Sequence, residues 1–262
     1  MSMSYARLDN TQPTTTDHAN ICVHISFFGT TTIRVDGQTH GKTPGHKSGA
    51  LLVYLVRNLG PHTRMHLADL LWDNLPRTRL LGNLRALIKR LPDEIKPYIH
   101  ITPEALAFKV CDEVWVDVLA VDDLAAQLPT PELRRDDTRY GQPRYTDLYM
   151  TQLHEKEHIV KDILRLYKGA FLEELIVDGA PRFAEWQRTQ QETLRRLTAD
   201  VLRNIVDLCL HQGRYVDGIA YARRWIALDP LEEESRRQLM VMLALDGQQQ
   251  VALNEYDTLV AM

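Results

Sequence analysis

The five residues HEKEH, from His154 to His158, have a spacing that could bind zinc. Two histidines four residues apart share one side of a helix and can ligate a zinc ion, while the glutamate between them acts as a general base. This H-E-x-x-H pattern is typical of zinc metalloproteases. It raises the question whether the protein is a zinc hydrolase or whether the match is a coincidence within a charged helix.

The helix predicted around this stretch, over about 147–168, turns both histidines to solvent. A catalytic zinc needs a concave, partly dry site with a third protein ligand, for which Glu173 or Glu174 lies at a tolerable distance in sequence. No strand or nucleophile-bearing cleft accompanies the motif. We therefore interpret HEKEH as a solvent face and predict neither a catalytic site nor a metal. The buried side of this helix is marked by apolar residues: Leu153, Ile159, Val160, Ile163, Leu164 and Tyr167.

Other motifs for chemistry are absent from the sequence, which has no P-loop, no G-x-G-x-x-G turn and no G-x-S-x-G elbow. The stretch GKTPGHKSG (Gly41 to Gly49) has the wrong order for a P-loop and reads as a linker, from which Lys47 could touch a DNA phosphate. The three cysteines form no C-x-x-C pair, which speaks against a disulfide framework or a Cys-based zinc site. We predict no enzyme activity and no cofactor.

A helix predicted from about Pro76 to Leu91 could read DNA with one of its faces. Its core face is apolar, and its outer face contains no acidic residue. Arg and Lys suit guanine edges and phosphates, Asn suits adenine, and the small residues Gly82 and Ala86 let the backbone come close to the groove. The blander interpretation is a solvated basic face. Together with Lys47, the candidate DNA-binding residues are Thr78, Arg79, Asn83, Arg85, Lys89 and Arg90.

The elements around this helix have the order of a winged helix-turn-helix domain. Alternating β-branched runs from Ile21, broken at Gly29 and Asp36-Gly37, predict a small antiparallel sheet. Two amphipathic helices follow, one that ends at Gly60-Pro61 and one that ends near Trp72. After the basic helix, YIHI, ALAFKV and VWVDV read as a closing hairpin.

The second half reads as helical beyond Asp117, where we find no further strong strand signal. The Pro- and charge-rich stretch Leu128 to Asp147 is predicted to be a loop. Besides 147–168, helices are predicted over about 181–211, 214–228, 231–246 and 249–262. The stretches that begin at Gly213 and Gly247 have small and apolar residues at similar offsets from the glycine. This pattern is typical of tetratricopeptide helix pairs.

Composition supports two domains in this chain of 262 residues, with 44% hydrophobic and 25% charged residues. We predict a disordered tail over 1–19, a DNA-binding domain over 20–116 and a helical domain over 117–262. Residues 20–116 carry 12 basic and 8 acidic groups, whereas residues 117–262 carry 18 basic and 25 acidic groups. One half can therefore face a polyanion and the other a protein. Without an apolar span or a signal peptide, we expect a cytoplasmic protein and no membrane partner.

The sequence resembles the AfsR/SARP-type transcriptional regulators, which join an OmpR-like winged helix to a helical bacterial transcriptional activator domain. The stretches FFGTTTIRVDG, HKSGALLVYLVRNLGPHTRMHLADLLW and NLRALIKRLP are similar to the first module. The second is matched by LYKGAFLEEL, the Trp186 helix and GRYVDGIAYARRWIALDPLEEESRRQLMVMLALDGQQQVALNEYD. Coverage runs from about Ile21 to the last residue. The fold class implied is mostly α with a small β component.

The resemblance implies an activator that binds direct repeats near promoters on double-stranded DNA. It also implies contact with RNA polymerase, with its sigma subunit as the partner, through the turn that contains Asp73, Asn74 and Arg77. The helical domain would serve regulation and a homo-oligomer on DNA. The sequence departs from this pattern at the wing tip, where Glu104 stands in place of a basic residue.

Two other hypotheses remain open at the level of sequence. In the first, the protein is an interaction module of a regulatory assembly with little DNA binding, which the acidic helical half and the unhelpful wing support. In the second and weakest, HEKEH binds zinc for hydrolysis.

Overall fold

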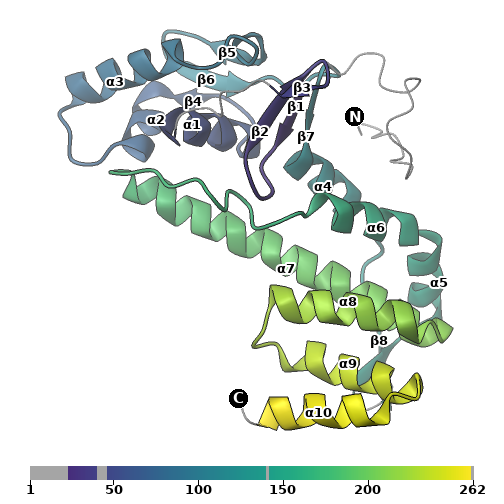
Figure 1. Ribbon diagram of the computed structural model, residues 1–262. Helices are drawn as coiled ribbons and strands as arrows, with labels where there is room; N and C mark the ends of the chain where they lie inside the picture. The colour runs from purple at the N-terminus through teal and green to yellow at the C-terminus, as the bar shows by residue number, and fades with distance from the viewer. Residues whose placement is uncertain (1–22, 40–45, 140–141, 261–262) are drawn as a thin grey trace. The chain divides into compact units, whose positions relative to one another are not determined.

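The computed structural model describes residues 23–39, 46–139 and 142–260, so the tail predicted over 1–19 lies outside the described residues. The chain forms two compact units, each made of two segments (Figure 1). Unit 1 comprises residues 1–123 and 166–193, and unit 2 comprises residues 124–165 and 194–262. The domain limits drawn from the sequence at 19/20 and 116/117 stay a prediction.

A four-stranded sheet opens unit 1, with the strand order β3-β2-β1-β7. Strand β1 (Val23–Ser26) pairs antiparallel with β2 (Thr32–Val35), so that the buried Ile25 faces Ile33, and β2 pairs with β3 (Gln38–Thr39). Asp36 and Gly37 join β2 to β3 with φ values of 49° and 77°. Positive φ at both central residues is the requirement of a tight hairpin turn, which confirms the predicted hairpin.

Three helices and a second sheet complete the winged helix-turn-helix architecture. The helices are α1 (His46–Arg57), α2 (Arg64–Leu71) and α3 (Arg77–Lys89), close to their predicted bounds. A three-stranded sheet with the order β4-β6-β5 contains the wing hairpin. Its strands are β4 (His62–Thr63), β5 (Ile99–Ile101) and β6 (Ala105–Phe108), and a 3-10 helix, η1 (Lys96–Tyr98), precedes β5.

Strand β7 (Val114–Val116) corrects the predicted closing hairpin, because VWV does not pair with the wing. It lies parallel to β1, with Val114 opposite Val23 and Val116 opposite Ile25. All four of these side chains are buried. Pairing with β1 therefore places Val114 and Val116 in the apolar core of this sheet.

Helix α4 (Asp117–Ala125), which the sequence did not predict, begins at a buried carboxylate. The Asp117 carboxylate accepts hydrogen bonds from the backbone N–H groups of Phe27, Phe28 and Val118, with distances of 2.7–3.1 Å. Burial raises the pKa of Asp117 to about 6, while these hydrogen bonds and the positive charge of Lys168 act in the opposite direction. Asp117 therefore ties the end of β1 to the start of α4.

The second segment of unit 1 packs on the same sheet and on α1. Phe171 forms a β-bridge with Phe28, and Gly29 N–H donates to the Ala170 carbonyl at 3.0 Å. Near the start of α7 (Pro181–Gln212), the centre of the Trp186 ring lies 5.0 Å from the centre of the Tyr54 ring in α1. Residues 166–193 thus belong to the same compact unit as the winged helix-turn-helix elements.

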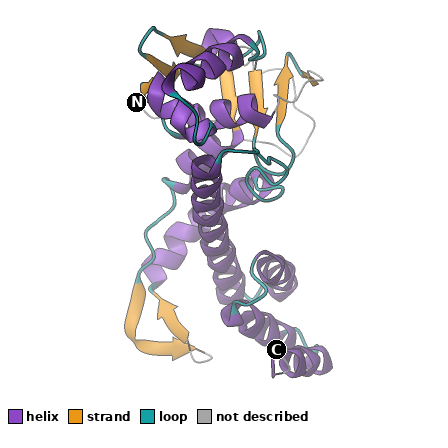
Figure 2. Cartoon of the chain, turned by 90° about the vertical axis from the view of Figure 1, so that its left-hand side faces the viewer, coloured by secondary structure: helices purple, strands orange, loops and turns teal. Residues whose placement is uncertain are grey.

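Unit 2 is mostly helical, but it contains a β-hairpin that the sequence did not predict. Strand β8 (Leu133–Arg139) pairs antiparallel with β9 (Gln142–Tyr145), as the two-stranded ribbon in Figure 2 shows. The prediction of a loop from Leu128 to Asp147 is therefore wrong over these residues. The stretch carries no alternation of apolar residues, so only the pairing of its backbone reveals the strands.

The helix predicted over 147–168 is two helices, α5 (Asp147–Glu155) and α6 (Glu157–Leu166), which are separated at Lys156. In a continuous helix, positions 156 and 157 would lie on the same buried face as Tyr149 and Leu153 and would need apolar side chains. These positions are Lys and Glu. The Lys156 amine donates instead to the carbonyl of Gln127.

The last helices, α8 (Tyr215–Leu228), α9 (Glu233–Leu245) and α10 (Gln249–Val260), pack in sequence, α8 on α9 and α9 on α10. Gly218 of α8 allows close contact, because a Cβ there would lie 2.8 Å from Met242 Sδ and 3.2 Å from Cys209 Cβ. This stacking of helix pairs confirms the tetratricopeptide-like prediction. None of the helices that the structure describes has the length and apolar character needed to cross a bilayer.

Candidate nucleic-acid interface

Helix α3 has one buried face and one basic exposed face, as its sequence predicted. Its apolar face is buried through Leu80, Leu84, Leu87 and Ile88, and Leu91 just beyond the helix is 2% exposed. Leu81 of the same helix is only half-buried. The packed face fixes the orientation of the helix, so the opposite face is presented to solvent in a defined way.

The outer face contains the predicted DNA-binding residues. Gly82 and Ala86 lie between the basic residues and are themselves exposed, and a Cβ added at Gly82 would meet nothing within 4 Å. The surface at the middle of the helix is therefore low and open, with cations on both sides. Asn83 is half-buried, whereas the other predicted residues of this helix are exposed: Thr78, Arg79, Arg85, Lys89 and Arg90.

Helix α2 and the turn after it hold α3 in place. Thr63 caps α2, because its side chain accepts a hydrogen bond from His66 N–H at 3.3 Å. The chain then passes through residues 72–76 into α3, with Asn74 in the left-handed region at φ 53°. Asp73 N–H donates to the carbonyl of Gly179 at 3.2 Å, which ties the turn to the second segment of unit 1.

The three residues predicted to contact polymerase lie on this turn and are exposed. Asn74 Nδ2 donates to Asp73 Oδ2 at 2.7 Å, so these two side chains form one polar group. Arg77 is the first residue of α3. The turn thus presents an acidic, an amide and a basic side chain beside the basic face of α3.

Lys47 is engaged within the protein. Its amine donates to the Leu71 carbonyl at 2.6 Å and lies 5.2 Å from the centre of the Trp72 ring. Burial lowers the pKa of Lys47, while the negative charge of Asp178 acts in the opposite direction. The amine stabilises the C-terminal end of α2 in this arrangement, so contact with a phosphate would require it to leave Leu71. That contact stays a prediction.

The wing turn between β5 and β6 is held by an arginine that the sequence analysis did not single out. The Arg64 guanidinium donates two hydrogen bonds to the Thr102 carbonyl, at 2.9 and 2.7 Å, and Arg64 N–H donates to the Glu104 carbonyl at 2.9 Å. Arg64 begins α2, so it joins the wing to the helix-turn-helix. No local sequence signal marks this role, because it depends on a contact between residues 38 positions apart.

The wing itself carries few cations, as the sequence indicated. Pro103 and Glu104 at its tip are exposed, and the exposed His100 and Lys109 lie on or beside its strands. The face of α3, rather than the wing, therefore concentrates the positive charge of this region.

The HEKEH stretch spans the break between α5 and α6, so its two histidines do not share one continuous helix. Both are exposed, as predicted, and His154 Nδ1 lies 2.8 Å from Gln212 Nε2. Glu157 is held by ion pairs with Lys161 at 2.8 Å and Arg214 at 3.0 Å. Burial acts to raise the pKa of Glu157, but hydrogen bonds from Lys161 and Arg214 bring it below its ordinary value.

Within the residues that the structure describes, no three His, Cys, Asp or Glu side chains are grouped so that they could hold a metal ion.

Comparison with known proteins identifies the helical part of the chain. Residues 148–262 match the family model of the bacterial transcriptional activator domain. The regulatory protein AfsR of Streptomyces coelicolor (strain ATCC BAA-471 / A3(2) / M145) is 23% identical over 222 residues, which are 84% of this chain and 20% of AfsR. The chain therefore spans about a fifth of the length of this curated relative.

A solved structure shares the fold. Mycobacterium tuberculosis EmbR, in complex with a low-affinity phosphopeptide, superposes with a TM-score of 0.59 at 17% identity, over 90% of this chain and 58% of that chain. The fold class is therefore confirmed as mostly α with a small β component, a winged helix-turn-helix followed by a helical domain. The predicted resemblance to AfsR/SARP-type transcriptional regulators is also confirmed. The matched family model is that of a transcriptional activator domain, and AfsR is a regulatory protein.

Proposed function

We propose that this protein is a sequence-specific DNA-binding transcription activator that reads double-stranded DNA with α3. The observation that carries this proposal is the outer face of α3, on which Arg79, Arg85, Lys89 and Arg90 are exposed around the low surface at Gly82 and Ala86. Such a face fits a major groove, which admits a helix and offers guanine edges and phosphates to basic side chains.

The residues of α3 divide by position into two groups. Thr78, Arg79 and Asn83 lie in the first half, where recognition helices contact base edges, and each bidentate contact there is worth about 1–3 kcal/mol of discrimination. Lys89 and Arg90 lie at the end of the helix, next to where the phosphate backbone passes. Since the wing has few cations, we assign most of the affinity to α3.

The turn at Asp73, Asn74 and Arg77 is the surface that we propose for contact with RNA polymerase, its sigma subunit in particular. Its exposure beside α3 supports this assignment, because a protein on promoter DNA would present the turn next to the DNA. By resemblance to the regulators named above, we further propose binding to direct repeats, with two copies of the chain on DNA.

Fluorescence anisotropy of the purified protein tests the proposal, with labelled duplexes that tile the region upstream of its own gene and an unrelated duplex for comparison. One of these duplexes should bind selectively. The double variant R79A/K89A should then bind it about 10 to 100 times more weakly, because two exposed cations of α3 are removed while the buried face is unchanged.

The matched control is R34A/R182A, which removes two exposed arginines of unit 1 outside α3. Its affinity should stay within about twofold of that of the unsubstituted protein. Equal losses in both double variants would contradict the assignment to α3. Weak binding to every duplex, indifferent to sequence, would favour instead an interaction module with little DNA binding.

A further inference from the structure

An apolar groove lies between α9 and α10 of unit 2. Its volume is about 550 Å³, and the amide of Gln249 and the hydroxyl of Tyr256 are the polar side-chain groups among its lining residues. Leu253 and Tyr256 of α10 are 58% and 55% exposed although they are large and apolar. Their neighbours in the groove are Met240, Val241, Ala244, Leu245 and Ala252.

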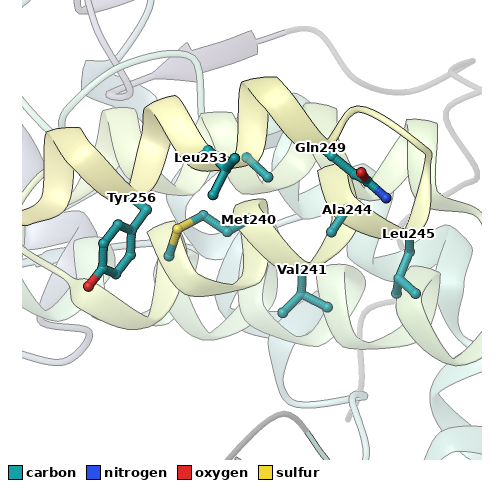
Figure 3. Close-up of a pocket in the computed structure, with 8 residues that line it drawn as sticks. Met240, Val241, Ala244, Leu245, Gln249, Leu253 and Tyr256 are labelled. Carbon is teal, nitrogen blue, oxygen red and sulfur yellow. The ribbon is translucent and has the colours of Figure 1, made fainter.

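The groove is elongated. Figure 3 shows Tyr256 at one end, Met240 and Leu253 in the middle, and Leu245 and Gln249 at the other end, along the facing lengths of the two helices. A long, shallow apolar surface fits a rod-like partner better than a compact small molecule. An amphipathic helix that lays its apolar residues into such a groove is a recurring mode of peptide recognition.

The stacking of this unit also favours a helix. In a tetratricopeptide-like array, each helix covers apolar surface left open by its predecessors, as α9 covers α8 and α10 covers α9. Met242 of α9, for example, is fully buried against Gly218 of α8. The groove is the corresponding apolar surface of the α9–α10 pair, on which a further helix could pack. Contiguous exposed apolar surface of this kind marks interaction sites.

The net charge of α9 and α10 selects among helical partners. From Glu233 to Val260 the chain has five acidic and two basic residues. Both basic residues already have acidic neighbours, since Arg236 lies 3.8 Å from Glu255 and Arg237 pairs with Glu234. The two helices thus have a net negative charge. Two of the acidic residues are the next residues in sequence after residues that line the groove: Asp246 after Leu245 and Asp257 after Tyr256.

We propose that the α9–α10 groove binds a basic amphipathic helix of a partner protein, with leucine-like side chains in the groove and Lys or Arg beside Asp246 and Asp257. A second copy of this chain is disfavoured as the occupant, because two surfaces with the same acidic surplus would face each other. This inference concerns the helical unit and does not depend on DNA binding.

The test uses the full-length protein and a fluorescein-labelled peptide of about 18 residues, long enough to form a helix. The peptide is composed of Leu and Lys, with Leu at helical spacing, and its counterpart has Glu in place of every Lys. The Leu/Lys peptide should bind saturably, and the Leu/Glu peptide should bind at least about tenfold more weakly. Equal affinity of the two peptides, or no binding of either, would overturn the proposal.

The variant L253K places a charge within the groove, whereas L231K makes the same change at a leucine that is 81% exposed and does not line the groove. L253K should weaken Leu/Lys peptide binding about tenfold or more, and L231K by less than about twofold. Y256K provides a second groove variant with the same expectation. Equal effects of L253K and L231K would overturn the proposal, with thermal unfolding as the check that each variant folds. So would a dimer in sedimentation that L253K dissociates, because a second copy would then occupy the groove.

Discussion

The buried carboxylate of Asp117 makes the stability of unit 1 depend on pH in a direction that can be tested. Asp117 is 3% exposed, and burial raises its pKa from 3.8 to about 6. Since the folded state then holds the proton more tightly than the unfolded state, this group contributes stability that is fully present below about pH 4. The contribution is lost as the pH rises through about 6.

The magnitude follows from the two pKa values. The difference between 3.8 and about 6 corresponds to a loss of about 3 kcal/mol in the free energy of unfolding across this window. In the variant D117N the side chain cannot titrate, so this loss should disappear. The amide also keeps only one oxygen, which leaves the N–H of either Phe28 or Val118 without its acceptor and should cost about 1–3 kcal/mol at all pH values.

Urea unfolding of the protein and of D117N at a series of pH values measures the effect. The advantage of the unsubstituted protein over D117N should shrink by about 3 kcal/mol between about pH 4 and about pH 7. Because other groups titrate in both proteins, they cancel in this difference. The control D112N changes an exposed carboxylate and should leave the profile unchanged. Parallel profiles for the protein and D117N, or an advantage that grows with pH, would refute the reasoning.

Four other substitutions test particular features of the structure. G82A should stabilise the protein by about 1 kcal/mol, because alanine has a higher helix propensity than glycine. G218A should not gain this stability, because its Cβ would be overpacked against Met242 and Cys209. Thermal unfolding in which G218A is more stable than G82A would contradict this. R64A should increase amide exchange in the β5–β6 turn, while K109A should not; unchanged exchange in R64A would show that the two bonds to Thr102 do not hold the wing. H154A should have the same substoichiometric zinc content as the unsubstituted protein, and stoichiometric zinc lost in H154A would revive a metal site at HEKEH.

Periodic patterns predicted most of the helices of both halves, because these helices have one clear apolar face, but they missed α4 and the break between α5 and α6. In α3, the spacing of Leu80, Leu84, Leu87 and Ile88 alone placed the basic residues on the outer face. The turn at Asp36-Gly37 was also predictable, since few residues other than glycine tolerate its positive φ.

The features that sequence patterns missed depend on distant partners. Strand β7 pairs with β1, some 90 residues earlier, and nothing within VWV distinguishes that partner from the wing. The β8–β9 hairpin has no apolar alternation, and the role of Arg64 arises from its contact with Thr102. Lys47 reads as a free cation in the sequence, whereas in the fold its amine is bound to Leu71.

The salt dependence of DNA affinity tests the central proposal most directly. If the four cations Arg79, Arg85, Lys89 and Arg90 each neutralise about one phosphate, the slope of log affinity against log salt should be about −3 to −4. For R79A/K89A the slope should be shallower by about 2. A slope near zero in the unsubstituted protein, or the same slope in R79A/K89A, would contradict a DNA-reading role for α3.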